Sequence, residues 1–264
     1  MGKKKDSLEL YFHIPFCIKK CDYCDFLSGP ATRAGQEAYI YALLREMKAV
    51  SAIEKRTVDT VFIGGGTPSV PECGIMEKLL QGIGKNFQLA ADAEVTIEAN
   101  PGTLTPEKLA LYRRYGINRI SIGLQSPENQ ELRALGRIHN YQQFLESYHM
   151  AREAGFSNIN IDLMFAIPGQ SYEGWIQNLR TVAKLGPEHI SAYSLIIEEG
   201  TPFSARKLDL PDEDTEYRMY EDVAAVLGKY GYYQYEISNY AKKDRNCRHN
   251  EGYWQRKDYL GLGL

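Results

Sequence analysis

The chain lacks three features that would each point to a particular class of protein. None of its apolar runs approaches the length of a transmembrane helix, which predicts a soluble protein. No apolar stretch follows the basic cluster Lys3-Lys4-Lys5, so a solvated tail is predicted there rather than a signal peptide. Positive charge is not in excess, because the formal net charge is −3 over 264 residues, and a nucleic-acid-binding surface is therefore not expected.

Disulfide bonds are not expected either. The five cysteines are an odd number, and nothing in the sequence marks the chain as secreted. Free thiols predict a reducing compartment, most simply the cytoplasm. A chain of this length can bury one substantial core, and a change of pattern after Gly200 predicts a main domain at residues 1–200 with a small extension at residues 201–264.

Three of the cysteines lie within eight residues, and they are the strongest chemical signal in the chain. Cys17, Cys21 and Cys24 follow the strand-like run 8–14 with the spacing C-x3-C-x2-C. Three thiolates from one tight loop leave an open position on a tetrahedral metal or at one corner of a four-iron cluster. Such an open position predicts chemistry rather than a purely structural role.

A structural zinc site is the alternative interpretation of these cysteines. Its fourth ligand would come from a distant part of the chain, with the candidates Cys73, Cys247 and His249. Structural zinc usually brings two C-x2-C units, and only one is present, so zinc is the less favoured interpretation.

Short β-rich runs alternate with amphipathic helical stretches from Leu8 onward. Strands are predicted at residues 8–14, 58–63, 94–99, 118–123, 158–165 and 189–195. Helices are predicted at residues 36–53, 105–116, after Pro127, 141–154 and 172–185. These repeats favour parallel strands with right-handed crossovers, in an open doubly wound sheet or in a barrel. Polar residues follow nearly every strand at its C-terminal end, which favours a partial (βα)6 barrel.

The pattern changes beyond Gly200. A helix at residues 212–229 and a strand at residues 232–238 are predicted. The last residues, 259–264, are predicted to begin a glycine-rich turn that stops short. The extension is therefore predicted to be truncated.

Several strand-end residues have a chemical interpretation beside a structural one. The glycines of Gly64-Gly65-Gly66-Thr67-Pro68 expose backbone groups that suit the ends of a small zwitterion, although a plain tight turn explains them equally well. Glu98 would bind ribose hydroxyls or an ammonium group unless it faces solvent. Arg137 would pair with a carboxylate unless it lies on the surface. Gln125 lies on the face of its strand opposite the apolar residues, and Asp162 in a buried strand needs a partner.

A histidine near the C-terminal end is a candidate ligand. His249 lies close to Cys247 and could bind heme iron or another metal, although a lone histidine is more often structural. Tyr253 and Trp254 follow it. They are predicted either to stack against a flat ligand or to belong to the core.

Taken together, these residues resemble a known family. The cysteine spacing and the glycine motif resemble the radical S-adenosylmethionine (SAM) enzymes. Six further strings are similar to the coproporphyrinogen-dehydrogenase-like branch: His13-Ile14-Pro15-Phe16-Cys17, Glu98-Ala99-Asn100-Pro101, Arg119 to Ser126, Leu135-Gly136-Arg137, Ile167-Pro168-Gly169-Gln170 and Glu199-Gly200-Thr201-Pro202. The resemblance runs from Leu10 to the C-terminus.

The resemblance implies a fold, cofactors and site residues. In this family, which folds as a partial (βα)6 barrel, the three cysteines hold a [4Fe-4S] cluster whose fourth iron chelates SAM, and an electron from the cluster generates a 5′-deoxyadenosyl radical. Positions around the first SAM are matched by Tyr11, Gly65 and Glu98. Positions around a second SAM in the decarboxylating enzyme are matched by Tyr23, Gly66, Thr67, Gln125, Arg137 and Asp162.

Two branches of the family differ at two places in the sequence. The decarboxylating branch has a further cysteine two residues after the third, where this chain has Phe26. Phenylalanine there, together with His249-Asn250-Glu251-Gly252-Tyr253-Trp254, resembles the HemW-type heme chaperones. Proteins of that branch bind heme and pass it to heme-accepting proteins. The histidine of the motif, here His249, is implicated in the binding of heme. An electron donor to the cluster is a further implied partner.

Two other hypotheses stay open at this point. One is an oxygen-independent coproporphyrinogen III oxidase, and the other is a zinc-stabilised barrel without redox chemistry. The sequence departs from the family at Ala166, where glycine is common. The extra methyl group is predicted to narrow a backbone approach without changing the assignment.

Overall fold

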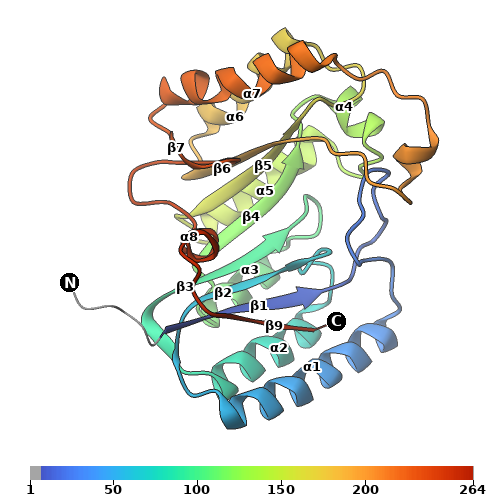
Figure 1. The fold of residues 1–264 in the computed structure, drawn as a ribbon. Coiled ribbons are helices and arrows are strands. Elements are labelled where there is room, and N and C mark those ends of the chain that lie inside the picture. The colour runs from blue at the N-terminus through green and yellow to red at the C-terminus, as the bar shows by residue number, and fades with distance from the viewer. Residues whose placement is uncertain (1–6, 264) are drawn as a thin grey trace.

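A curved, mainly parallel sheet forms the centre of the molecule (Figure 1). The structure is a computed structural model that describes residues 7–263, so Lys3-Lys4-Lys5 and Leu264 lie outside the described residues. Six parallel strands follow one another across the sheet in chain order: β1 (Ser7–Ile14), β2 (Thr57–Gly65), β3 (Leu89–Ala99), β4 (Arg119–Gln125), β5 (Ile159–Phe165) and β6 (His189–Ser194). This order confirms the predicted α/β class with parallel strands.

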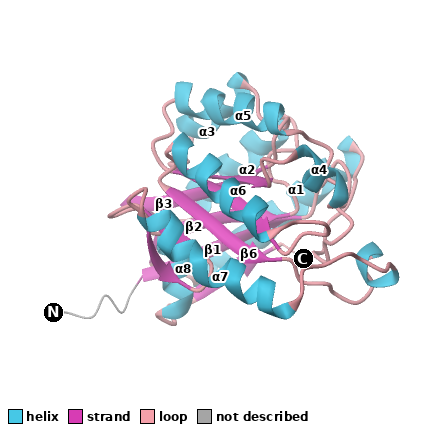
Figure 2. Ribbon diagram, turned by 90° about the horizontal axis from the view of Figure 1, so that it is seen from above, coloured by secondary structure: helices cyan, strands magenta, loops and turns pink. Residues whose placement is uncertain are grey.

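Helices connect the strands and cover one face of the sheet (Figures 1 and 2). They are α1 (Arg33–Ile53), α2 (Cys73–Asn86), α3 (Pro106–Arg114), α4 (Asn129–Ala134), α5 (Tyr141–Glu153) and α6 (Tyr172–Leu185). Side chains that accept a hydrogen bond from the first turn begin four of them: Thr32, Thr105, Asn140 and Ser171. These N-caps explain why the helices start where they do, since they satisfy amide groups that have no partner within the helix.

The two faces of the sheet have different chemistry. Leu8, Leu10 and Phe12 of β1 are buried in the apolar core, whereas the alternation of a strand turns the side chain of Glu9 to the concave face. Buried polar side chains on the other strands also meet on the concave face, among them Thr60, Glu94, Arg119, Asn160 and His189. The interior of the partial barrel is therefore polar, and the apolar core lies between the sheet and the helices.

Residues beyond 200 extend this sheet at both of its edges. They form the 3-10 helix η1 (Pro202–Ala205), α7 (Glu213–Gly228), β7 (Tyr233–Glu236), β8 (Asn239–Ala241), α8 (Arg248–Trp254) and β9 (Tyr259–Leu262). β8 pairs antiparallel with β6 and with β7, whereas β9 pairs parallel with β1 at the opposite edge. In the described part of the chain, β7 and β9 are the two edges and do not pair with each other, so the barrel is partial.

One prediction for this region is confirmed in part, and another is wrong. The predicted strand 232–238 is present as β7, which ends at Glu236 because a tight turn leads from there into β8. The segment predicted to begin a glycine-rich turn is instead the strand β9, because its backbone finds hydrogen-bond partners on β1.

The short helix α8 packs on the concave face of the sheet, at the end where the strands begin (Figure 1). Its His249 contacts Thr60 on β2 and Glu94 on β3. Within residues 7–263, no helix combines the length and the apolar character that crossing a bilayer requires.

Candidate functional site

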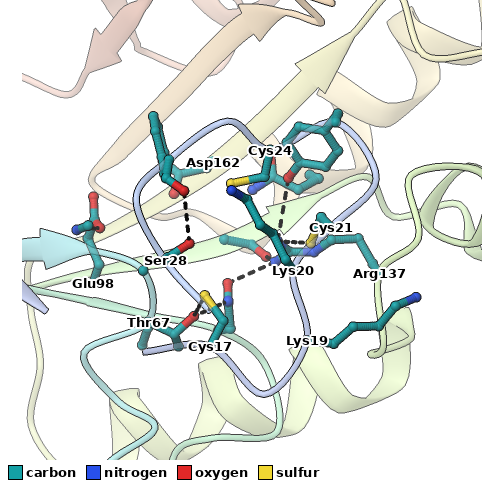
Figure 3. A pocket seen from close by; sticks show the side chains of 18 of the residues that line it. Cys17, Lys19, Lys20, Cys21, Cys24, Ser28, Thr67, Glu98, Arg137 and Asp162 are labelled. Atoms are coloured by element: carbon teal, nitrogen blue, oxygen red, sulfur yellow. Dashed lines mark hydrogen bonds between the residues drawn. The ribbon is translucent and has the colours of Figure 1, made fainter. Parts of the chain in front are cut away.

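The three clustered cysteines lie on one closed loop between β1 and α1. Backbone hydrogen bonds from Gly29 N to Pro15 O and from Cys17 N to Gly29 O, both 2.9 Å, join the two ends of this loop. A further hydrogen bond from Cys24 N to Cys21 O, 3.2 Å, tightens the turn between the second and third cysteines. The loop therefore presents all three half-buried thiols to the same pocket (Figure 3).

This pocket lies at the C-terminal ends of the strands. It holds about 210 Å³ of free space, more than ten times what one water molecule needs, so it suits a molecule rather than a single ion. Nearly all the site residues predicted from the sequence line it: Cys17, Cys21, Tyr23, Cys24, Gly65, Gly66, Thr67, Glu98, Gln125, Arg137 and Asp162. They come from the ends of five different strands and the loops that follow them, as expected for a barrel mouth.

The glycine motif packs directly against the cysteine loop. Gly66 N donates to Ile14 O at 2.9 Å, and Thr67 N donates to Phe16 O at 2.7 Å. A Cβ atom on Gly66 would lie 2.8 Å from Phe16 O, which is too close for any other residue without movement of the backbone. The threonine hydroxyl lies 3.6 Å from Cys17 Sγ. The motif thus serves both as a tight turn and as a wall of the pocket.

Arg137 holds several parts of the site together. Its Nη2 atom donates to Asn100 Oδ1 at 2.8 Å and to Gly123 O at 2.6 Å. Its Nη1 atom lies 3.6 Å from Cys21 Sγ and 3.5 Å from the Tyr23 hydroxyl. The alternative of a surface arginine is therefore wrong.

Two carboxyl groups stand on the interior side of the pocket. Burial and the nearby Asp162 raise the pKa of Glu98 to about 8, although Gly65 N donates to this carboxyl at 3.1 Å. Burial also raises the pKa of Asp162, which accepts hydrogen bonds from Asn160 Nδ2 at 2.6 Å and from Ser121 Oγ at 3.3 Å. Asp162 thus has the partners that a buried acid needs, and both groups would be stabilised by a cation in the pocket.

Gln125 lies in a strained backbone conformation at the end of β4. Its φ of 72° is unusual for a residue other than glycine, and the pairing of β4 with β5 shifts at this point. Its Oε1 atom accepts a hydrogen bond from the Tyr193 hydroxyl at 2.8 Å. The irregularity turns the amide towards the pocket, where it lies among the predicted residues.

Asn100 and Tyr193 are among the pocket residues that were not predicted from the sequence. Asn100 joins Arg137 to the glycine motif, because its Nδ2 atom also donates to Thr67 Oγ1 at 2.8 Å. Tyr193 on β6 also lines the pocket. The sequence pattern could have indicated both residues. Asn100 directly follows a predicted strand, and Tyr193 lies on the same face of its strand as the polar residues His189 and Ser191.

Two predicted residues lie outside this pocket. Tyr11 lines an adjacent hollow, which shares Phe26, Gly65 and Glu98 with the pocket. His249 lies on α8 at the opposite end of the barrel, is only 1% exposed, and has a pKa lowered by burial to about 4. The structure therefore does not bring the histidine and the cysteine loop together.

The arrangement of the thiols distinguishes between a single zinc ion and a four-iron cluster. Cys73 lies on α2, and Cys247 and His249 lie at the far end of the barrel, so none of these proposed zinc ligands lines the pocket. Across residues 7–263, no three His, Cys, Asp or Glu side chains are arranged to hold one metal ion. In a four-iron cluster each thiolate binds a different iron, so the ligands stand farther apart than around one ion. Three thiols that face a roomy pocket fit the cluster.

Comparison with known proteins identifies the family. The sequence profile of the radical SAM superfamily matches residues 11–182. The heme chaperone HemW of Escherichia coli is 43% identical over 262 residues, which cover 98% of this chain and 69% of that protein. The heme chaperone HemW of Haemophilus influenzae is 40% identical over 266 residues, which cover 98% of this chain and 70% of that protein. The chain belongs to the radical SAM superfamily and, within it, to the HemW family.

A solved structure agrees with this assignment. Coproporphyrinogen III oxidase (HemN) of Escherichia coli, described as a radical SAM enzyme, has a TM-score of 0.88 and is 27% identical to this HemW-family chain. The match covers 98% of this chain but only 64% of that one. The predicted family and the partial barrel are thereby confirmed, and membership of the superfamily implies a [4Fe-4S] cluster and SAM.

Proposed function

We propose that the protein is a heme chaperone, which binds a [4Fe-4S] cluster, SAM and heme and passes heme to acceptor proteins. The observation that carries the proposal is the loop with three half-buried thiols facing one pocket, in a chain of the HemW family. Phe26 supports it further, because this exposed phenyl ring stands on the pocket rim where the decarboxylating branch has a cysteine.

The residues of the pocket have complementary tasks in this proposal. Cys17, Cys21 and Cys24 hold the cluster, which when bound supplies an electron and an iron site for the amino and carboxylate groups of SAM. Gly65 and Glu98 contact the first SAM from one wall, with Tyr11 beside them. A further set of residues would complete the wall of the cofactor pocket, at positions that in the decarboxylating enzyme surround a second SAM: Tyr23, Gly66, Thr67, Gln125, Arg137 and Asp162. Arg137 also contacts Cys21, since its Nη1 atom lies 3.6 Å from Cys21 Sγ.

The proposed partners follow from the transported heme and from the cofactors. They are heme, heme-accepting proteins and an electron donor to the cluster. A site made of three free thiols needs a reducing compartment, and we propose the cytoplasm. His249 is the proposed heme-binding residue, although in this structure its ring is buried.

Cluster binding is tested by removing the thiols one at a time. Cys17→Ala, Cys21→Ala and Cys24→Ala should each abolish the intact cluster, so that iron after anaerobic reconstitution falls from roughly four per chain to below one. Each variant should stay folded, with its unfolding free energy changed by no more than about 1 kcal/mol, because these positions lie in a surface loop. Iron, acid-labile sulfide and absorbance give the result.

Cys73→Ala is the matched control, since this half-buried thiol lies on α2 outside the pocket and should not affect the cluster. Unchanged cluster absorbance in all three loop variants would refute the site. Zinc without sulfide in the wild-type protein would support the zinc hypothesis instead.

An oxygen-independent coproporphyrinogen III oxidase is the second candidate. The observation that favours it is the close structural similarity to HemN, with a TM-score of 0.88. The two functions are separated by parallel assays of the reconstituted protein. Saturable heme binding near one per chain, without turnover of coproporphyrinogen III, supports the chaperone. Turnover without saturable heme binding supports the oxidase.

A further inference from the structure

A strap of chain, residues 195–211, connects β6 to α7 and contains η1. Backbone hydrogen bonds attach it to the barrel near both of its ends, since Leu195 N donates to Phe165 O at 2.9 Å and Gly169 N donates to Asp209 O at 2.7 Å. In its middle, the side chain of Phe203 is only 1% exposed. The strap is therefore anchored at both ends and at its centre.

Phe203 belongs to a small apolar cluster that is separate from the main core. The buried members of this cluster are Leu135, Met164, Ile167, Leu195 and Phe203. Tyr23, which lies between the second and the third cysteine, packs against the cluster, and its ring centroid is 6.4 Å from that of Phe203. An apolar contact thus joins the strap to this part of the cysteine loop.

Polar contacts hold the same part of the loop at Asp22. Phe203 N donates to Asp22 O at 3.1 Å, and Arg206 Nη1 lies 2.6 Å from Asp22 Oδ2. From the chain that follows α4, Leu135 O accepts a hydrogen bond from Asp22 N at 3.3 Å. A Cβ atom on Gly136 would lie 2.7 Å from Asp22 Oδ1, so the backbone approaches closely there. Asp22 is therefore held from two sides, directly beside the second cysteine.

The first cysteine is held by a different contact. Cys17 N donates to Gly29 O at 2.9 Å, at the closure of the loop, and Cys17 lies three residues beyond the end of β1. The contacts of the strap lie instead at Asp22 and Tyr23. In Figure 1 the strap, drawn in orange, lies beside the blue loop that carries the cysteines. The loop closure and the strap therefore act on different thiols.

We propose that the strap positions the second and third cysteines for the cluster, with Phe203 and Arg206 as the positioning residues. This inference rests on the proposed cluster binding and adds residues outside the pocket that support it. Three thiolates that bind three irons of one cluster must keep their separations. Residues that orient metal ligands typically change metal affinity about 10–100-fold when they are replaced.

The proposal also gives a role to the motif Glu199-Gly200-Thr201-Pro202. Thr201 is the N-cap of η1, where its side chain accepts a hydrogen bond from Ser204 N at 3.4 Å. The threonine hydroxyl also donates to Glu198 O at 2.7 Å. These bonds fix the turn that presents Phe203 to the loop.

The two positioning residues should not contribute equally. The side chain of Arg206 is 52% exposed, and an ion pair with an exposed partner is weakened by water and salt. Phe203 is buried, so a smaller side chain loses packing that water does not replace. We therefore expect a larger effect of substitution at Phe203.

Alkylation of the thiols by iodoacetamide tests the proposal on the cluster-free protein. Peptide mass spectrometry gives the rate at each cysteine. Because the loop opens locally more often, Phe203→Leu should accelerate alkylation of Cys21 and Cys24 about fivefold to tenfold, and Arg206→Ala about twofold to threefold. Cys17 should change by less than about twofold, since its own contact remains. Unchanged rates at Cys21 and Cys24 in both variants would overturn the proposal, as would equal acceleration of all three thiols.

The reconstituted protein gives two further readouts under anaerobic conditions. An iron chelator should remove the cluster about ten times faster from Phe203→Leu than from wild-type protein, followed by absorbance. The midpoint potential of the cluster should also shift in this variant, because the potential depends on solvent exposure and hydrogen bonding at the sulfurs. Arg206→Lys retains the charge and should restore most of the stability that Arg206→Ala loses. Wild-type rates and potential in Phe203→Leu would contradict the positioning role.

Two substitutions elsewhere in the protein are the matched controls. Arg114→Ala removes an ion pair with Glu77 that has the same distance of 2.6 Å and an arginine that is also exposed. Phe156→Leu changes an equally buried ring of the main core. Both controls should leave the loop thiols and the cluster unaffected. If Phe156→Leu acts like Phe203→Leu, overall stability rather than position controls the loop, and the proposal is overturned.

Failure of this inference is distinguishable from failure of the proposed function. If wild-type protein binds no cluster, the proposed function fails, and the role of the strap in cluster binding fails with it. The alkylation rates then still decide whether the strap holds the two thiols. If wild-type protein binds the cluster and Phe203→Leu matches it in every readout, the proposed function stands and the strap has no positioning role.

Discussion

Ala166 has a backbone conformation that glycine adopts more easily. Its φ is 58°, and the side chain is buried at the end of β5. The left-handed conformation costs a residue with a Cβ atom roughly 1–2 kcal/mol, partly offset because glycine loses more entropy on folding. Ala166→Gly should therefore raise the free energy of unfolding by about 0.5–1 kcal/mol, measured by urea denaturation.

The opposite result at this position would also be informative. A loss of stability in Ala166→Gly would mean that the buried methyl group contributes more through packing than it costs in strain. The sequence comparison identified Ala166 as a departure from the family pattern. Only the backbone angle explains why glycine is favoured at this position.

At the scale of an element, the docking of α8 depends on one glycine. A Cβ atom on Gly252 would overlap the carboxyl group of Glu9, which is fully buried beneath the helix. Gly252→Ala should therefore push α8 away from the concave face and lower the free energy of unfolding by about 1–3 kcal/mol. Hydrogen exchange of the α8 amides and urea denaturation measure the two effects.

Gly84 on α2 provides the control for this substitution. A Cβ atom there meets no other atom within 4 Å, and alanine is a better helix former than glycine. Gly84→Ala should therefore leave stability unchanged or raise it by up to about 1 kcal/mol. If both variants behave alike, the tight fit of α8 over Glu9 is not what holds the helix.

At the scale of the whole molecule, buried carboxyl groups make stability depend on pH. Burial raises the pKa of Glu9 to about 7 and that of Glu98 to about 8, from an ordinary 4.5. The folded state keeps these protons to higher pH than the unfolded chain. The contribution of these two carboxyl groups to the free energy of unfolding is therefore fully present below pH 4.5 and is lost as the pH rises through 7 and 8.

Buried histidines lower the stability as the pH falls, and this effect is confined to acidic pH. The pKa of His249 is lowered to about 4 and that of His139 to about 3, mainly by burial. Below pH 6.5 the unfolded chain takes up protons that these folded rings do not, which favours unfolding. Above pH 6.5 the histidines are neutral in both states, and among these groups only the carboxyl effect remains.

The free energy of unfolding should therefore fall by about 1–3 kcal/mol between pH 6.5 and pH 8, since each proton contributes about 1.4 kcal/mol per pH unit. Urea denaturation of the cofactor-free protein measures it. The double variant Glu9→Gln/Glu98→Gln should show a flatter profile over the same range. A wild-type profile without any decrease would contradict the assignment to these two groups.

Several features of the protein depend on near neighbours in the chain and could be predicted from the sequence. The period of apolar residues identified the six parallel strands and most of the connecting helices, and the cysteine spacing identified the loop. The strand-end positions of Glu98, Gln125 and Asp162 also followed, because parallel strands bring their C-terminal ends to one edge. These features are set by local backbone geometry, so a single sequence contains them.

Other features arise from contacts between residues that are far apart in the chain, and they become visible only in the folded protein. Thr60 and His249 are 189 residues apart in the chain, and no local pattern places the histidine inside the barrel at the end opposite the cysteine loop. The sequence of β9 suggests a turn, and the segment forms a strand because its backbone pairs with β1. Asn100 belongs to the site because Arg137, 37 residues further along the chain, donates a hydrogen bond to it. The physical reason is that a hydrogen bond or a packed side chain depends on position in space, which the sequence specifies only through the complete fold.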